Sequence, residues 1–166
     1  MTLKNAFIAS SLAVALGFGG AALLTATTTY AYDETSTSAI NVDEQRVILK
    51  GYDTVSYFQG EPVEGSSRFA VEHDGAQYYF ANAENMKAFQ ANPAAYVPQY
   101  GGYCAMGAAL GKKLDVDPTQ YKVVDGKLYL NVNADVFQKW SEDVPGNIAK
   151  ADTNWPLIKD LAPNAL

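Results

Sequence analysis

The sequence predicts a small single domain of the α+β class, with two β-hairpin–helix units joined by a Gly-Gly-Tyr-Cys helical segment. The chain has 166 residues, 48% of them apolar, which suits one domain with a core. Two stretches, 74–89 and 125–140, align at an offset of 51 residues, and five of their sixteen positions are identical. The identical pairs are Asp74/Asp125, Gly75/Gly126, Tyr78/Tyr129, Asn82/Asn133 and Ala83/Ala134. Both stretches open with Asp-Gly between apolar runs, a strong short signal for a β-hairpin.

The first 31 residues have the features of a secretory signal peptide. Lys4 gives a positive start, residues 6–26 carry no charge, and Ala31 ends a Thr-Tyr-Ala sequence that suits cleavage. An uncleaved membrane anchor is the alternative, because a spanning helix needs about 20 apolar residues. We therefore predict a signal peptide over 1–31, a disordered polar tail over 32–46, and a periplasmic or secreted protein without stable membrane insertion after processing.

Each Asp-Gly pair predicts a hairpin followed by a helix. The flanking strands are predicted at 68–73 with 76–81 and at 121–124 with 127–132, and a further short strand is predicted at 53–58. Asn82 and Asn133 stand where a helix N-cap belongs. Apolar residues then recur at helical spacing, and Pro93 and Pro145 are expected to end the two helices. The segment 147–161 predicts one last short helix, or two helices broken by Pro156.

Composition narrows the range of functions. The formal net charge is −6 and the sequence pI is about 4.6, and no cluster of Lys and Arg is present. Phosphate backbones are bound by such clusters, so a nucleic-acid partner is not expected. Cys104 is the only cysteine, which excludes an intramolecular disulfide.

Four motifs resemble the YHS-domain family, and in particular its exported bacterial branch. They are LKGYDTVSYF at 49–58, YYFANAENMKAFQANPAAY at 78–96, YGGYCA at 100–105 and KLYLNVNADVFQKW at 127–140. The resemblance runs from about 47 to 155 and implies a YHS-like domain over 47–166. Heavy-metal relatives carry two metal-ligating cysteines where this chain has Ala81 and Asn85, so that metal chemistry is not implied here.

Cys104 is the candidate for chemistry. Gly101 and Gly102 are expected to turn the chain into a helix that begins near Tyr103, and a thiol in a first helical turn has a lowered pKa. A thiolate would suit a nucleophile or a soft-metal ligand, whereas a buried thiol would pack as a small hydrophobe. Met106 and His73 are predicted to join Cys104 as metal ligands, for a soft transition metal such as copper, if folding brings them together.

Tyr52, Asp53 and Tyr103 are the candidate ligand-binding residues, in a pocket beside Cys104. Asp53 has the alternative of closing a turn. The leading hypothesis is an exported non-enzymatic YHS-domain protein that binds a metal ion or small ligand near Cys104. The alternatives are a structural or protein-interaction module without cofactor, and a thiol-dependent redox protein in which His73, the only histidine, would have to act as the base. We further predict that Cys104 is shielded from solvent.

Overall fold

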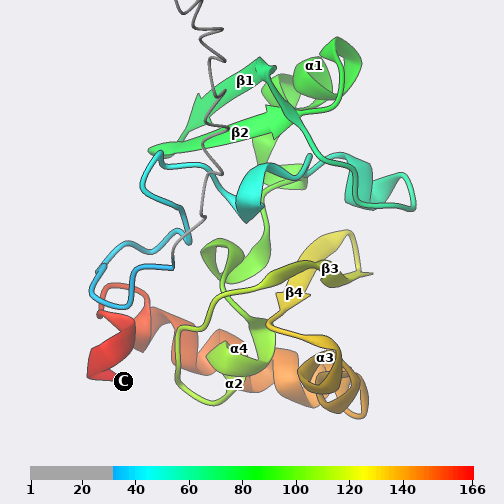
Figure 1. The fold of residues 1–166 in the computed structure, drawn as a ribbon. Coiled ribbons are helices and arrows are strands. Elements are labelled where there is room, and N and C mark those ends of the chain that lie inside the picture. The colour runs from blue at the N-terminus through cyan, green and yellow to red at the C-terminus, as the bar shows by residue number, and fades with distance from the viewer. Residues whose placement is uncertain (1–31) are drawn as a thin grey trace, which may run out of the picture.

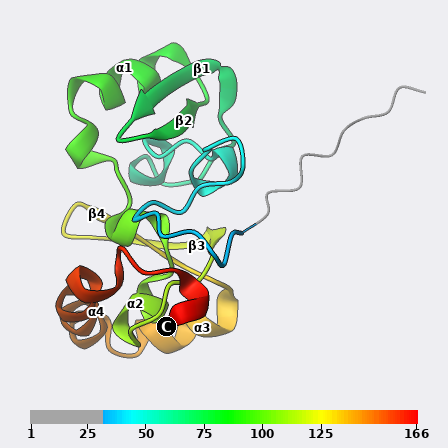
Figure 2. The ribbon, with the colours of Figure 1, turned by 90° about the vertical axis from the view of Figure 1, so that its left-hand side faces the viewer.

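The computed structural model describes residues 32–166, so the predicted signal peptide lies outside the described residues. This part of the chain has the predicted α+β architecture (Figures 1 and 2), and it contains no helix long and apolar enough to cross a membrane. The strands are β1 (Ser66–His73), β2 (Ala76–Phe80), β3 (Asp117–Val124) and β4 (Lys127–Asn131). The helices are α1 (Ala83–Ala91), α2 (Ala105–Ala109), α3 (Ala134–Ser141) and α4 (Val144–Ile158).

Both predicted hairpins are confirmed, and they share one register. β1 pairs with β2 and β3 pairs with β4, and every paired residue of the first hairpin has its counterpart 51 positions later in the second. The backbone φ angles are 48° at Asp74 and 78° at Gly75, and 50° at Asp125 and 72° at Gly126. Two consecutive positive φ angles define the tight hairpin turn that Asp-Gly favours.

Both predicted helix caps are confirmed as well. The Asn82 side chain accepts a hydrogen bond from the Asn85 backbone N–H, and the Asn133 side chain accepts one from the Val136 N–H. Each bond satisfies a donor that the first helical turn leaves free. The repeat therefore includes hairpin, cap and helix.

The repeat extends farther upstream than the sequence comparison indicated. The short 3₁₀ helix at Leu49–Gly51 has φ angles of 50°, 53° and 85°, and the equivalent residues 100–102 have 53°, 60° and 81°. Isolated bridges join Val47 to Gln77 and Pro98 to Leu128, again at an offset of 51. We call residues 47–91 the first unit and residues 98–142 the second unit.

Two local predictions are wrong. Residues 53–58 do not form a strand: they turn, with a 3₁₀ helix at Ser56–Phe58, because the Asp53 carboxylate bonds the Val55 N–H and closes the turn. Pro145 does not end α3, but stands in the first turn of α4, where a missing N–H is tolerated. Of the two alternatives for the C-terminal segment, the single helix is confirmed: Pro156 does not break α4, since the Lys159 N–H still bonds the Trp155 carbonyl beyond it.

Residues 32–46, predicted to be a disordered tail, contact both units: Arg46 bonds Gly75 of the first unit, and the residues before Val42 lie against the second. The Tyr32 hydroxyl donates to the Lys113 carbonyl (2.6 Å), and the Asn41 N–H donates to the Gly101 carbonyl (2.8 Å). The Lys113 ammonium, almost fully buried, donates to the Ser38 carbonyl at 2.7 Å and to two carbonyls near the C-terminus. Composition could not indicate this, because backbone groups and one distant lysine hold the segment in place.

Candidate functional site

Cys104 is fully buried, as predicted, at the N-terminus of α2 rather than inside a helix that begins near Tyr103. The Gly107 N–H donates to its sulfur at 3.3 Å, and the thiol lies 3.6 Å from Asn131 Oδ1. Apolar core residues of the first unit and of β4 belong to the same cluster. The thiol is therefore shielded inside the folded monomer.

The pKa of Cys104 moves in the direction opposite to the one predicted. Burial raises the pKa of the thiol, and the backbone N–H groups of Gly107, Val132 and Met106 offset that rise only in part. The loss of hydration on burial outweighs these N–H groups. Burial therefore favours the protonated thiol over the thiolate, which disfavours a role as a nucleophile.

The three predicted metal ligands each make other contacts. His73 ends β1, where its ring packs against Tyr78 and Phe89 and pairs with Asp74 at 3.4 Å. Met106 lies on α2, partly buried against both core clusters. Within residues 32–166, no group of three His, Cys, Asp or Glu side chains is arranged to hold a metal ion. A site that includes the Met106 sulfur is of a different type and stays a prediction.

Cys104 takes the position in the second unit that Asp53 takes in the first. The two residues are 51 apart and follow the matching sequences Gly-Tyr and Gly-Tyr. The Asp53 N–H donates to the Val63 carbonyl (2.9 Å), and the Cys104 N–H donates to the Leu114 carbonyl (3.0 Å), itself 51 residues farther on. Both side chains are fully buried. The two candidate residues thus stand in equivalent positions of different units instead of forming one pocket.

The Asp53 carboxylate accepts three hydrogen bonds, two of them buried and one partly buried. Its Oδ1 accepts from the Val55 N–H at 2.8 Å, and its Oδ2 accepts from the Ala81 N–H at 3.0 Å and from Asn85 Nδ2 at 2.7 Å. A buried carboxylate with all these bonds holds the turn, the end of β2 and the start of α1 together. Asp53 therefore has the structural role that was the alternative for it, which is to close a turn.

In the second unit, Cys104 and Asn131 together accept hydrogen bonds in place of that carboxylate. Met106 is the counterpart of Val55, and its N–H donates to Asn131 Oδ1 at 3.2 Å, because the cysteine sulfur accepts from the Gly107 N–H instead. The Asn131 oxygen thus replaces one carboxylate oxygen, and the Cys104 sulfur takes part of the role of the other. This explains an unpaired cysteine at this position by packing alone, and the matching Gly-Tyr pairs were the signal that sequence reasoning missed.

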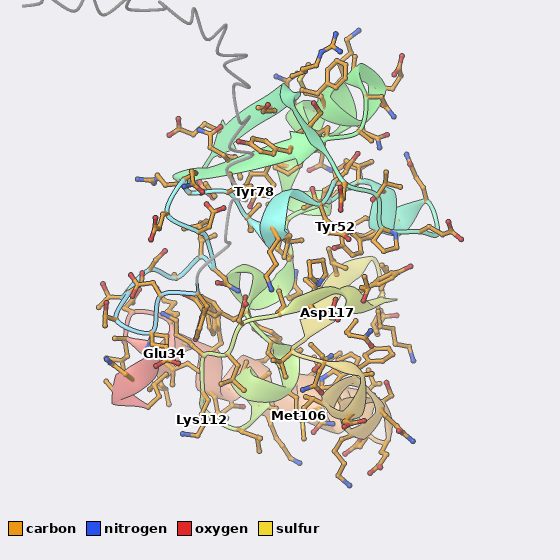
Figure 3. All side chains as sticks on the ribbon, in the orientation of Figure 1. Glu34, Tyr52, Tyr78, Met106, Lys112 and Asp117 are labelled. Atoms are coloured by element: carbon orange, nitrogen blue, oxygen red, sulfur yellow. The ribbon has the colours of Figure 1, made fainter. Side chains whose placement is uncertain are left out.

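The other two predicted ligand-binding residues, Tyr103 and Tyr52, differ in how far a ligand could reach them. Tyr103 is buried, and its hydroxyl donates to the Ser38 carbonyl at 3.0 Å. Tyr52, by contrast, lines a groove of about 640 Å³ at the junction of the two units. The lining residues, which define what we call the Tyr52 groove, are Lys50, Gly51, Tyr52, Glu64, Gly65, Ser66, Ser67, Tyr79 and Pro118. Figure 3 labels Tyr52 between the β1–β2 hairpin and β3.

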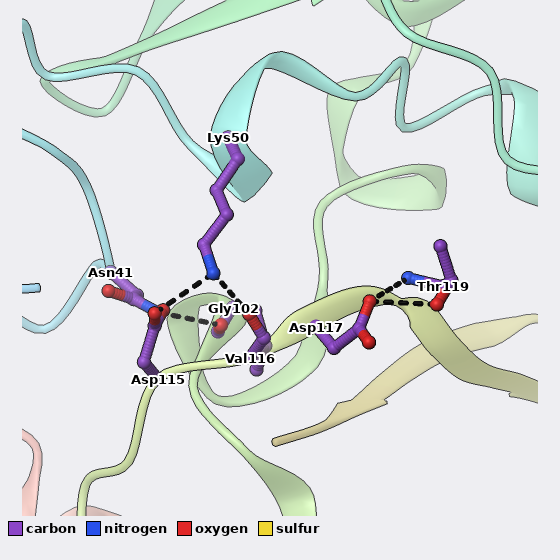
Figure 4. A network of polar contacts seen from close by, with 7 residues as sticks. All are labelled: Asn41, Lys50, Gly102, Asp115, Val116, Asp117 and Thr119. Atoms are coloured by element: carbon purple, nitrogen blue, oxygen red, sulfur yellow. Dashed lines mark hydrogen bonds and ion pairs between the residues drawn. The ribbon is translucent and has the colours of Figure 1, made fainter. Parts of the chain in front are cut away.

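Lys50 connects the groove to the second unit (Figure 4). Its ammonium donates to the Val116 carbonyl at 2.7 Å and pairs with Asp115 Oδ2 at 3.0 Å. The Asn41 side chain donates to Asp115 Oδ1 at 3.0 Å and to the Gly102 carbonyl at 3.3 Å. The lysine side chain is therefore held toward β3. No local pattern predicted this network, since its members are far apart in the sequence.

Comparison of the chain with protein-family models, curated proteins and solved structures finds no match.

Native Cys104 should react with a maleimide or an aromatic disulfide at least about 100-fold more slowly than the thiol of the unfolded chain, because reaction requires the site to open. The measurement is the labelling rate at neutral pH, with and without denaturant. Labelling in the native protein as fast as in denaturant would contradict the burial of the thiol and revive its candidacy as a nucleophile.

Proposed function

We propose that this chain is an exported, non-enzymatic binding module of the YHS-domain type that holds its ligand in the Tyr52 groove. The observation that carries this proposal is the groove itself, which combines a tyrosine ring with small and polar residues at the junction of two packed units. Ligand sites are typically concave surfaces with a few placed polar groups. The export signal and the family resemblance come from the sequence alone.

The role of Cys104 in this proposal is structural. Its thiol is buried with a raised pKa, and its contacts are those of a turn residue. A thiol enzyme needs a base beside its nucleophile. His73, the only histidine, packs against the rings of Tyr78 and Phe89 instead. These contacts favour a binding protein over a redox or thiol enzyme.

A chemical-shift titration of the ¹⁵N-labelled chain tests the proposal. The probes are a library of small organic fragments and a tryptic digest of an unrelated protein. We expect shifts of the Gly51, Gly65 and Ser67 amides with at least one probe class. Ser67→Arg should abolish the response by filling the groove, whereas Ser141→Arg, the same change at an exposed position of α3, should preserve it.

Two outcomes would contradict the proposal. One is the absence of any saturable shift at the groove with both probe classes. The other is a response confined to residues around Cys104, such as Met106 and Asn131, which would return the ligand site to the cysteine.

A further inference from the structure

The surface of the second unit that corresponds to the Tyr52 groove is covered by a piece of the chain itself. The covering segment is 38–41, a bent stretch with the sequence Ser-Ala-Ile-Asn. Its contacts are made mainly through the backbone: the Asn41 N–H donates to the Gly101 carbonyl, and the Ser38 carbonyl accepts from the Tyr103 hydroxyl. The Asn41 side chain adds bonds to Gly102 and Asp115.

Most of the residues that segment 38–41 contacts in the second unit have counterparts in the first unit that line the Tyr52 groove. Segment 38–41 hydrogen-bonds to Gly101, Gly102, Tyr103, Lys113 and Asp115, and the counterparts of these residues 51 positions earlier are Lys50, Gly51, Tyr52, Pro62 and Glu64. All of these counterparts except Pro62 line the Tyr52 groove. The two units thus present equivalent surfaces, of which one is occupied by a segment of the chain and the other is open.

We infer that the Tyr52 groove binds a short peptide segment of a partner protein, an inference that rests on the groove being the binding site proposed above. The Tyr52 hydroxyl donates to a carbonyl of the peptide, as the Tyr103 hydroxyl does to Ser38. The Glu64 carboxylate accepts from a side-chain amide or hydroxyl, as Asp115 does from Asn41. Recognition through backbone atoms suits a short peptide of small and polar residues, the kind that segment 38–41 provides.

One difference between the units determines how the peptide lies. A Cβ atom at Gly101 would come within 1.8 Å of the Ala39 carbonyl oxygen, so the covering segment uses the space that glycine leaves. Lys50 stands at this position in the first unit with a similar φ of 53°, and its Cβ occupies that space. The bound peptide therefore passes farther from residue 50 and relies on the Tyr52 and Glu64 side of the groove.

The test uses a synthetic peptide with the sequence of residues 35–42, Thr-Ser-Thr-Ser-Ala-Ile-Asn-Val, acetylated and amidated at its ends. We expect it to shift the Gly51, Tyr52, Gly65 and Ser67 amides of the full chain saturably. Tyr52→Phe should weaken the peptide about 3- to 10-fold, which is the usual effect of one lost hydrogen bond. Tyr96→Phe, at a tyrosine that packs on Phe58 outside the groove, should leave the affinity unchanged.

Several results would overturn the inference. They are the absence of shifts with the peptide, shifts confined to residues 101–103, and equal peptide affinity of wild type and Tyr52→Phe. If organic fragments bind the groove and the peptide does not, the peptide inference is wrong while the proposed function stands. If neither binds, both are wrong.

Discussion

Asp53→Ala should lower the free energy of unfolding by about 3–5 kcal/mol, because each buried donor left without a partner costs about 1–3 kcal/mol. The substitution removes the acceptor of the Val55 and Ala81 N–H groups and of the Asn85 side chain in one step. The residue is fully buried, so water cannot replace the lost bonds without opening the core. Urea unfolding followed by circular dichroism gives the measurement.

Asp143→Ala is the matched control for this change. Asp143 caps α4 through one exposed bond to the Gly146 N–H, and the loss of such a cap costs about 1 kcal/mol. If Asp53→Ala and Asp143→Ala destabilise the protein equally, the carboxylate of Asp53 does not hold the turn, β2 and α1 together, and its equivalence to Cys104 loses its structural meaning.

Gly101→Ala should cost about 3 kcal/mol, the sum of backbone strain and displacement of the covering segment. The φ angle of 60° disfavours any residue with a Cβ, and the new Cβ would overlap the Ala39 carbonyl oxygen. Segment 38–41 must therefore leave the second unit, with loss of the bonds from Asn41 and to Ser38. Hydrogen exchange of the Asn41 amide reports that loss directly.

Gly126→Ala separates the two contributions. Gly126 has a φ of 72°, but no atom lies within 4 Å of the position its Cβ would take. This control should cost about 1 kcal/mol from backbone strain alone and should leave the protection of the Asn41 amide intact. Equal costs for the two substitutions, with Asn41 still protected in Gly101→Ala, would show that the segment does not depend on the space at Gly101.

The two units share one backbone arrangement, but their side chains differ, and so do the surfaces beside the shared turn. In the first unit a carboxylate fixes the turn, and the neighbouring surface remains a groove. In the second unit a cysteine and an asparagine fix the same turn, and the neighbouring surface is covered by residues 38–41. The glycine at 101 permits that cover, and the lysine at 50 prevents the same seating in the first unit.

The sequence by itself determined the hairpins, their turns and the helix caps. Asp-Gly selects its turn from the φ preferences of two residues, and Asn82 and Asn133 cap helices through donors three residues away. These interactions are local, because the residues that make them are within a few positions of one another in the sequence. The shielding of Cys104 also followed, from the small and aromatic residues on either side of it.

Only the tertiary structure decided the protonation of Cys104, the path of residues 32–46 and the existence of the Tyr52 groove. The thiol pKa depends on burial beneath residues from both units, and the groove depends on Pro118 meeting a loop more than 50 residues earlier. The Asp53 turn shows the same limit, since its partners at Ala81 and Asn85 are about 30 residues away and cannot be recognised from residues 53–58 alone. Desolvation and long-range hydrogen bonds act between groups that the chain brings together only when it folds.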